Sequence, residues 1–422
     1  MKIVISHVYS NNNAGDAALL SVLLRDLRET FNNPEIVILT MDKVSDGETF
    51  DDTPLENGFM YHAVNRYYNH AALRMFYSLS LIVSTLCSAV IYRLTGKHIP
   101  LPSHLRIIAA RYEEADLIVP AGGGYIRGKA GLTNTLKFLF MIQPLLFGYI
   151  IGKPTISYTQ SIGPFGNRTQ ALLAAFILKR IDGIMVREST SLELLRKLGV
   201  SQKVFSSIDA GFLFSSDDKK DLRNELGASK GQMLIGITAR NWLAPGKQDS
   251  YEKAVAGFCD HLIERYHAMV LIIPQVTAER YGDDDRETGN HIYQSIVRKN
   301  GVRVLTERYD PKNIKAIYDG LDYLIGARFH SVIFALTAGV PSIAIEYEHK
   351  TSGIMHDLGL DAWVIKIEDV TAEKLDILFA RLIDQQKDYR AHLAATLPTY
   401  VARAGEASMF MRQTYERHIK QS

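Results

Sequence analysis

The chain has 422 residues, of which 47% are hydrophobic and 22% charged, so we expect a folded protein with two domains rather than one ordinary core. Lys plus Arg number 48 against 46 Asp plus Glu, and this balance gives no argument for a nucleic-acid partner. The two cysteines, Cys87 and Cys259, show no CxxC or metal-type spacing, which excludes a disulfide scaffold or zinc ribbon and suits a reducing compartment.

The first predicted strand, from Lys2 to Ser6, runs into the sequence SNNNAGDAALL. There Gly15 and Asp16 precede an apolar helical pattern. A strand, a small-residue turn and a helix start are the geometry of an anion or ligand loop, but the turn has neither GxGxxG nor a Walker lysine. A plain N-cap turn with Asp16 in the first helical turn explains the same residues equally well. The amino terminus lacks the pattern of a signal peptide, so we expect a cytoplasmic protein.

Residues 42–111 interrupt the α/β alternation and are predicted to be an insertion. Within them, 77–92 carries no charge and reads YSLSLIVSTLCSAVIY, with Arg74 and Arg93 as its flanks. This run is short for a membrane-spanning helix. It is either a core helix beside the sheet or a helix lying at a membrane surface, which basic and aromatic flanks would favour.

After the insertion, three strands end in polar or glycine-rich turns. Asp116 to Pro120 leads into AGGGYIRGKAG, where three glycines would let the backbone approach a ligand or neighbouring domain, unless they form a flexible turn. The strand from Thr155 to Tyr158 leads into TQSIGPFG. The strand from Gly183 to Val186 is followed by Arg187, which either binds a ligand or forms a surface ion-pair network with Glu188. The candidate ligand-binding residues of these turns are Gly122, Gly123, Gly124, Gln160, Ser161 and Arg187.

The second half repeats the alternation after a charged segment at 215–232, which we interpret as the interdomain linker. The strand Leu234 to Thr238 is followed by ARNW, which contains Arg240. The next strand leads into PQVTAERYGDDD. Its acidic tip could be a metal-adjacent group or a mobile lid, but without ligand spacing we favour a solvated loop.

The most informative stretch is YLIGARFHSVIFALTAGVPSIAIEYEHK, residues 323–350. It predicts a strand, a turn, a helix beginning near His330 and a second strand. Arg328 and His330 then lie at the carboxyl end of a strand, where ligands bind in open parallel sheets. An arginine fork suits a phosphate or carboxylate, and a histidine can transfer a proton near neutral pH. A surface arginine and a core histidine are the alternative.

These elements predict an α/β protein of two doubly wound, Rossmann-like domains that face each other across a cleft. We expect an N-terminal domain over 1–215, with the insertion at 42–111. A C-terminal domain would cover 216–390. The helical segment 391–422 would pack back on the N-terminal domain.

The sequence resembles the polysaccharide pyruvyl transferase family. The matching segments are NNNAGDAAL, AGGGYIR, TQSIGPF, VRESTS, DAGF and GARFHSVIFALTAGVPSIAIEYEHK, in the expected order over nearly the whole chain. The resemblance implies a glycosyltransferase-B-like fold. It also implies transfer of a pyruvyl group from phosphoenolpyruvate to a sugar of an exopolysaccharide or cell-surface glycan, or of its lipid-linked oligosaccharide precursor. The family's Arg–x–His motif corresponds to Arg328 and His330, and a further donor-binding arginine to Arg187 or Arg240.

On this hypothesis the N-terminal domain is the acceptor side and the C-terminal domain the phosphoenolpyruvate side. Arg328 and one of those two arginines bind the anionic donor, while His330 acts as acid and base. Asp16 would orient the sugar hydroxyls, and Glu346 and Lys350 are further substrate-binding candidates. No cofactor is expected besides phosphoenolpyruvate as co-substrate, and no metal constellation appears.

Two alternatives stay open. The first is a nucleotide-sugar glycosyltransferase of the same fold, in which Glu346 or Glu348 would bind ribose hydroxyls. The second is a membrane-peripheral scaffold that docks through 77–92 among other glycan-assembly enzymes.

Overall fold

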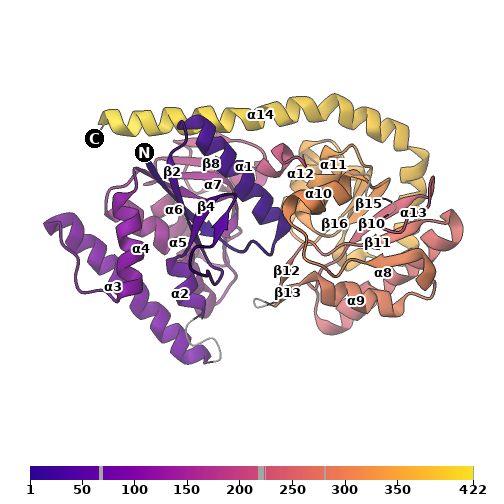
Figure 1. The fold of residues 1–422 in the computed structure, drawn as a ribbon, viewed down its shortest axis with the longest axis horizontal. Helices are drawn as coiled ribbons and strands as arrows, with labels where there is room; N and C mark the ends of the chain where they lie inside the picture. Colours follow the sequence, from indigo (N-terminus) through magenta and orange to yellow (C-terminus); the bar gives the residue numbers. More distant parts are fainter. Residues whose placement is uncertain (66–69, 217–222, 224, 280–281, 422) are drawn as a thin grey trace. The chain divides into compact units, whose positions relative to one another are not determined.

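The computed structural model describes the chain except for residues 66–69, 217–222, 224, 280–281 and 422. The chain divides into two compact units, each with its own parallel sheet (Figure 1). Unit 1 comprises Met1–Asn11, Leu19–Ala210 and Arg403–Ser422, and unit 2 comprises Asn12–Ala18 and Gly211–Ala402. The division after Ala210 precedes the predicted linker at 215–232, part of which falls outside the described residues.

The sheet of unit 1 is built in two parts. One has the order β3-β4-β2-β1-β5 and the other the order β6-β7-β8-β9, and a parallel bridge from Ile118 to Thr155 connects them. The apolar runs of the central strands are buried, as parallel sheets covered by helices require. The strands are β1 (Lys2–Val8), β2 (Glu35–Thr40), β3 (Thr49–Phe50), β4 (Thr53–Asn57), β5 (Leu117–Pro120), β6 (Gly123–Ile126), β7 (Ile156–Ile162), β8 (Gly183–Val186) and β9 (Val204–Ser206).

The segment 42–111 is only partly an insertion. Its first part forms β3 and β4, and β4 continues the sheet by pairing in parallel with β2, as Ile38 opposite Leu55 shows. No strand pattern is apparent in the sequence there, because Pro54 and acidic residues interrupt the apolar positions. The remainder is helical. The helices assigned mainly to unit 1 are α1 (Ala14–Thr30), α2 (Phe59–Asn65), α3 (Ala71–Thr95), α4 (Ser103–Glu114), α5 (Leu132–Ile150), α6 (Arg168–Leu178) and α7 (Ser189–Lys197).

The uncharged run 77–92 lies inside α3, a helix of 25 residues. The helix extends past both arginine flanks, so it is longer than the uncharged run. Within the described residues, α3 is the one helix long and apolar enough to cross a membrane by length and composition. Its buried face belongs to a core shared with α4 and α5, around Ala109, Tyr112 and Phe147.

The main sheet of unit 2 has the strand order β14-β11-β10-β15-β16-β17, with all pairs parallel, and β12 and β13 form a separate antiparallel pair. This is the Rossmann order: β11 and β14 are added on one side of β10, and the chain then returns to add β15, β16 and β17 on the other side. The strands are β10 (Leu234–Thr238), β11 (Met269–Ile272), β12 (Thr277–Ala278), β13 (Asp283–Asp284), β14 (Val302–Val304), β15 (Tyr323–Gly326), β16 (Ser342–Glu346) and β17 (Val364–Lys366).

Most helices of unit 2 connect one strand of its sheet to the next. Helices α13 and α14 follow the last strand, and α14 is divided between the two units. Helix α14 contributes its residues up to Ala402 to unit 2 and the rest to unit 1. The helices are α8 (Pro245–Tyr266), α9 (Asp285–Ser295), α10 (Pro311–Asp319), α11 (Phe329–Thr337), α12 (His349–Asp357), α13 (Ala372–Asp384) and α14 (Gln386–Gln421).

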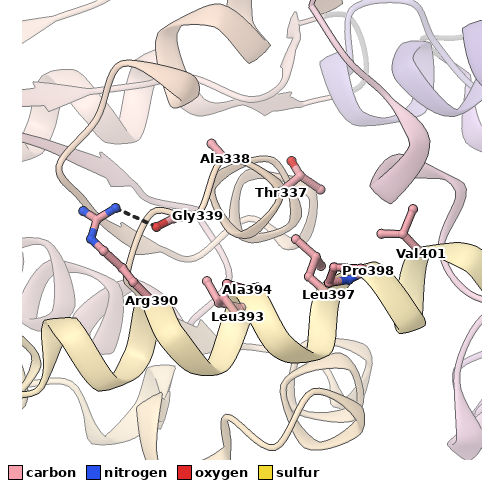
Figure 2. A pocket seen from close by; sticks show the side chains of 9 residues that line it. All are labelled: Thr337, Ala338, Gly339, Arg390, Leu393, Ala394, Leu397, Pro398 and Val401. Carbon is pink, nitrogen blue, oxygen red and sulfur yellow. Dashed lines mark hydrogen bonds between the residues drawn. The ribbon is translucent and has the colours of Figure 1, made fainter.

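A groove of about 510 Å³ lies between α14 and the C-terminal end of α11 (Figure 2). Its lining is mostly aliphatic, and the Arg390 guanidinium closes one side by donating a hydrogen bond to the Gly339 carbonyl at 2.8 Å. Arg328 lies at the opposite, N-terminal end of α11. The groove is therefore distinct from the region of the Arg–x–His motif.

Candidate active site

Two arginines lie at the carboxyl edge of the unit 2 sheet, where its strand order reverses. Arg240 comes two residues after β10, and Arg328 comes two residues after β15. The last paired residues of these neighbouring strands, Thr238 and Gly326, are in register. Both arginines therefore leave the sheet at the same level, at the point where doubly wound sheets bind their ligands.

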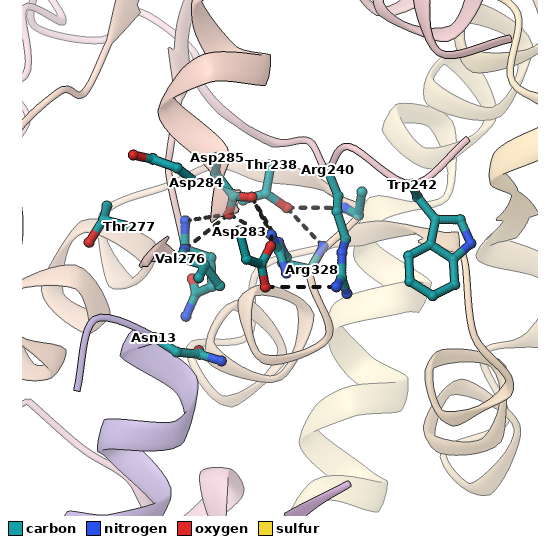
Figure 3. Close-up of polar contacts among 12 residues, drawn as sticks. Asn13, Thr238, Arg240, Trp242, Val276, Thr277, Asp283, Asp284, Asp285 and Arg328 are labelled. Carbon is teal, nitrogen blue, oxygen red and sulfur yellow. Dashed lines mark hydrogen bonds and ion pairs between the residues drawn. The ribbon is translucent and has the colours of Figure 1, made fainter. Parts of the chain in front are cut away.

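Arg328 is buried and held by two carboxylates (Figure 3). Its Nε donates to both oxygens of Asp285 at 3.0 Å, and one Nη donates to Asp283 at 2.5 Å. Burial alone would lower the pKa of Arg328, but these carboxylates outweigh burial and raise it. The main chain is fixed as well, since the Thr238 hydroxyl accepts hydrogen bonds from the amides of Ala327 and Arg328.

The acidic tip GDDD is a structural part of this site, so our interpretation of it as a solvated loop is wrong. Asp285 is buried, and besides Arg328 it accepts hydrogen bonds from the amides of Gln275 and Val276, both at 3.0 Å. Burial raises the pKa of Asp285 above its ordinary value. Burial would also raise the pKa of Asp283, yet the Arg328 charge outweighs it and lowers that pKa. The sequence could not show that these carboxylates face an arginine 43 residues after Asp285 and 45 after Asp283.

Arg240 lies between two aromatic rings. Its guanidinium carbon is 4.9 Å from the ring centre of Trp242 and 4.5 Å from that of Tyr347, distances at which a cation interacts with an aromatic face. It also approaches Asp283, with 3.8 Å between Nη2 and the carboxylate, so Asp283 lies between Arg240 and Arg328 (Figure 3).

Lys350 joins the same cluster from the first turn of α12. Its ammonium lies 5.7 Å from the centre of the Tyr347 ring and 5.3 Å from that of Phe329, and it pairs with Glu348 at 3.3 Å. Burial would raise the pKa of the Tyr347 phenol, but Lys350, Arg240 and Arg328 together lower it. At the phenol, these three cations outweigh both burial and the neighbouring Glu348. We name Arg240, Arg328, Tyr347 and Lys350 the cationic cluster.

His330 lies in the first turn of α11, with 8% of its surface exposed. It packs directly against Gly15, where an added Cβ would be 2.0 Å from the His330 Nδ1. Gly15 belongs to the short segment Asn12–Ala18 that groups with unit 2. A glycine is required there because any side chain would collide with the imidazole. The NNNAGD and Arg–x–His segments, far apart in the sequence, thus meet in one unit.

Backbone hydrogen bonds hold the NNNAGD segment in place. The amide of Ala14 donates to the Gln275 carbonyl at 3.1 Å, and the amide of Thr277 donates to the Asn12 carbonyl at 2.8 Å. Asn13 caps α1, because its side-chain oxygen accepts from the Gly15 amide at 3.1 Å. The Asp16 carboxylate accepts from the Asn13 side-chain amide at 2.9 Å.

The other candidates of unit 2 lie near this cluster in sequence. Glu346 ends β16, and its carboxylate accepts a hydrogen bond from Ser352 at 2.5 Å. Glu348 precedes α12 and pairs with Lys350. Unit 2 therefore contains Asp16, Arg240, Arg328, His330, Glu346 and Lys350.

The remaining candidates belong to unit 1, where Arg187 is fully buried rather than part of a surface network. Its Nη1 donates to Asp209 at 2.7 Å, and its Nε donates to Ser161 at 2.7 Å and lies 3.5 Å from Glu188. Ser161 in turn donates to Glu188 at 2.9 Å, and the buried Gln160 side chain donates to the Ala121 carbonyl. These polar groups bond to one another inside the unit.

Two of the three glycines begin a strand instead of a flexible turn, since Gly123 and Gly124 belong to β6 and Gly122 directly precedes it. An added Cβ at Gly122 would lie 3.0 Å from the Thr159 hydroxyl. At Gly123, φ is +143° and an added Cβ would collide with the Tyr125 ring. Both glycines therefore allow close packing against neighbouring side chains of the same unit.

The sequence did not single out Asp283, Asp285, Trp242 or Tyr347 as members of the site. Trp242 and Tyr347 each lie within three residues of a predicted candidate, which is the one local signal they offer. A tyrosine beside a lysine and two arginines becomes apparent only when β10, β15 and β16 are assembled.

Comparison with solved structures establishes the fold class. Solved structures of the glycosyltransferase-B fold align with the whole chain and confirm the predicted fold class. A putative UDP-N-acetylglucosamine 2-epimerase from Listeria monocytogenes aligns over 100% of this chain and 97% of its own, with TM-score 0.61 and 13% identity. Sucrose-phosphate synthase from Thermosynechococcus elongatus (TM-score 0.59, 13% identity) and Anabaena HepE in complex with UDP-glucose (0.56, 14%) each align over 100% of both chains.

Within this class, the chain belongs to the polysaccharide pyruvyl transferase family, whose sequence profile matches residues 13–349. The match begins in the NNNAGD segment and ends at the first residue of α12, one residue before Lys350, so it includes Asp16, Arg240, Arg328 and His330. The amylovoran biosynthesis protein AmsJ of Erwinia amylovora is 29% identical over 278 residues. That alignment covers 63% of this chain and 64% of the AmsJ sequence.

Proposed function

We propose that the protein transfers a pyruvyl group from phosphoenolpyruvate to two hydroxyls of one sugar in a cell-surface glycan or its lipid-linked precursor. The product is a pyruvate ketal, and phosphate is released. Membership of the polysaccharide pyruvyl transferase family supports this proposal. The observation that carries it is the cationic cluster beside the Arg–x–His motif, because the donor bears both a carboxylate and a phosphate.

We assign donor binding to Arg240 and Lys350. Arg328 belongs to the same site and is held in a fixed position beside them by its two carboxylates. Two carboxylates already neutralise Arg328, whereas Arg240 meets Asp283 only at 3.8 Å and keeps 15% of its side chain exposed. A phosphate or carboxylate of the donor can take the place of Asp283 as the partner of Arg240. Between Arg187 and Arg240 we therefore favour Arg240, since the guanidinium of Arg187 already donates hydrogen bonds to Asp209 and Ser161.

The reaction needs proton transfers that balance. The methylene carbon of phosphoenolpyruvate gains one proton and becomes a methyl group, while the adjacent carbon forms bonds to two sugar oxygens and loses the phosphate oxygen. The two hydroxyls release two protons, of which one balances the methyl group and the other leaves with phosphate. We assign these transfers to His330, with Tyr347 as a second proton donor whose pKa is lowered by the surrounding cations.

Asp16 is the proposed group that orients the sugar hydroxyls. Its segment packs beside His330 through Gly15, and the Asn13 amide holds its carboxylate. A carboxylate in this place can accept a hydrogen bond from a hydroxyl before that hydroxyl loses its proton.

The decisive experiment measures phosphate release from phosphoenolpyruvate by the purified chain, with and without a crude lipid-linked oligosaccharide acceptor, in EDTA. We expect acceptor-dependent release that continues without free metal ions. Arg240→Met and His330→Gln should each reduce kcat/KM by at least about tenfold. Arg265→Met is the matched control, because Arg265 also lies over an aromatic ring but at the end of α8.

Absence of release with every acceptor, together with tight binding of UDP-glucose, would contradict the proposal. It would favour the nucleotide-sugar glycosyltransferase alternative instead. Full activity in a folded His330→Gln variant would contradict the acid–base assignment alone.

A further inference from the structure

We propose that helix α3 lies flat in the interface of an anionic lipid bilayer, with its exposed apolar stripe among the acyl chains. This inference concerns a surface of unit 1 and does not depend on the proposed reaction. It rests on three observations: the stripe itself, the attachment of the opposite helix face to the core, and the charge of the surrounding segment.

The exposed face of α3 is apolar, although that of a surface helix in a soluble protein is usually polar. Phe76 is 73% exposed, Val83 54% and Leu94 78%. Phe76, Leu79, Val83, Val90 and Leu94 follow one another at intervals of three, four, seven and four residues, so they lie along one side of the helix, with the exposed Ser80 and Cys87 beside them. The exposed large apolar side chains of α3 are Leu73, Met75, Phe76, Leu79, Val83, Val90, Ile91 and Leu94.

The opposite face of α3 is anchored in unit 1. The Ser78 hydroxyl donates to the Ala63 carbonyl at 3.1 Å, and the Thr85 hydroxyl accepts from Gln143 of α5 at 2.9 Å. Leu81 and Ala89 pack in the core with α4 and α5, beside which α3 lies in Figure 1. Crossing a bilayer would require this face to leave the core and break these hydrogen bonds. The helix can therefore bury its free face in a membrane while it remains parallel to the surface.

The charge of this segment favours lipid over a second copy of the chain. Between Glu56 and Glu113 the sequence contains no Asp or Glu, but it contains six Lys and Arg residues. Arg93, Lys97 and Arg106 are exposed on or near α3 and α4. In a self-associated pair, these like charges would face each other without acidic partners. Anionic headgroups, by contrast, attract basic residues that border an inserted apolar face.

The test uses flotation of the full chain with vesicles of 30% phosphatidylglycerol in phosphatidylcholine, and with pure phosphatidylcholine vesicles. We expect binding to the anionic vesicles that weakens as salt is added. The variant Phe76→Ser/Leu79→Ser/Val83→Ser should bind at least about tenfold more weakly. The matched control is Val297→Ser/Ile377→Ser, which removes exposed apolar side chains of unit 2 and should bind like the parent chain.

A second variant separates charge from apolar contact. Arg93→Gln/Lys97→Gln keeps the stripe and should weaken binding to anionic vesicles by about fivefold per residue, with little effect on neutral ones. The only tryptophans of the chain, Trp242 and Trp363, lie in unit 2. A Phe76→Trp variant should therefore show a new blue-shifted emission that lipid-borne quenchers reduce, whereas Val297→Trp should not.

Failure of the parent chain to float, or equal flotation of the triple Ser variant, would overturn the proposal. So would light scattering that shows a dimer, abolished by the triple substitution, without any vesicle binding. These measurements need no phosphoenolpyruvate, so their failure is independent of the outcome of the activity assay.

Discussion

The carboxyl edges of the two sheets carry similar polar residues that are held in different ways. In unit 1, Arg187 follows β8 and is enclosed by Asp209, Ser161 and Glu188, with 1% of its surface exposed. In unit 2, Arg328 follows β15 and is also paired with two carboxylates. Beside it, however, Arg240 and Lys350 rest on aromatic faces with part of their side chains exposed.

The comparison shows that an arginine at the end of a strand is weak evidence for a ligand site. A buried ion pair with hydrogen bonds on every side is a structural feature. Replacing both of its partners with apolar side chains often leaves the free energy of unfolding unchanged, whereas removing one partner does not. What unit 2 has in addition is a second group of cations, Arg240 and Lys350, whose charges together with that of Arg328 lower the pKa of Tyr347. Cations that remain partly exposed on aromatic faces are what distinguishes the edge of unit 2 from that of unit 1.

The largest effect should come from breaking the buried network of unit 1. Arg187→Met leaves Asp209 and Glu188 buried without their cation, and we expect a loss of about 3–5 kcal/mol in the free energy of unfolding. Urea denaturation followed by circular dichroism would measure it. Adding Asp209→Asn should restore part of the loss. Arg180→Met, at an exposed arginine of the same unit, should change stability by less than about 0.5 kcal/mol. A small effect of Arg187→Met would mean that the network is not structural.

Arg240→Met should do the opposite, with weaker ligand binding and nearly unchanged stability. Loss of a charge-assisted contact costs about 1.5–3 kcal/mol, or roughly ten- to hundredfold in the dissociation constant of phosphoenolpyruvate. Titration calorimetry would measure this constant, with Arg265→Met as the control. Equal affinity in Arg240→Met, with reduced affinity in a folded Arg187 variant, would reverse our choice between these arginines.

The next expected effect concerns His7, a buried histidine at the edge of unit 1 whose imidazole is held in its neutral form. Its Nε2 donates to the Met141 carbonyl at 2.7 Å, so Nδ1 accepts from Ser6, and burial lowers the pKa of His7 to about 4. The unfolded chain, with a pKa of about 6.5, then takes up the proton first as the pH falls. The contribution of neutral His7 to the free energy of unfolding is fully present above pH 6.5 and is lost as the pH falls toward 4. Between pH 7.5 and pH 5 this loss amounts to about 2 kcal/mol. Urea midpoints at these two pH values should differ less in His7→Asn, which retains a side-chain amide donor and tolerates the φ of +63°.

The smallest expected effect concerns the NNNAGD segment. Asn13→Ala removes the cap of α1 and should cost about 1 kcal/mol of unfolding free energy. Asn13→Asp keeps the capping oxygen but replaces the amide that holds Asp16, so it should retain stability while altering the KM for the acceptor. Unchanged acceptor kinetics in Asn13→Asp would argue against a role for Asp16 in orienting the sugar.

The sequence by itself determined the alternation of strands and helices, the family, and the position of Arg328 and His330 at the end of a strand. These features are local, because the periodicity of apolar residues and the glycine and proline stops are written within one segment. The tertiary structure alone decided that Asp283 and Asp285 hold Arg328, that Gly15 meets His330, and that β4 extends the sheet. It also decided which face of α3 stays exposed. Such contacts join residues distant in the sequence, and they depend on the order of strands in the sheet, which no local pattern encodes.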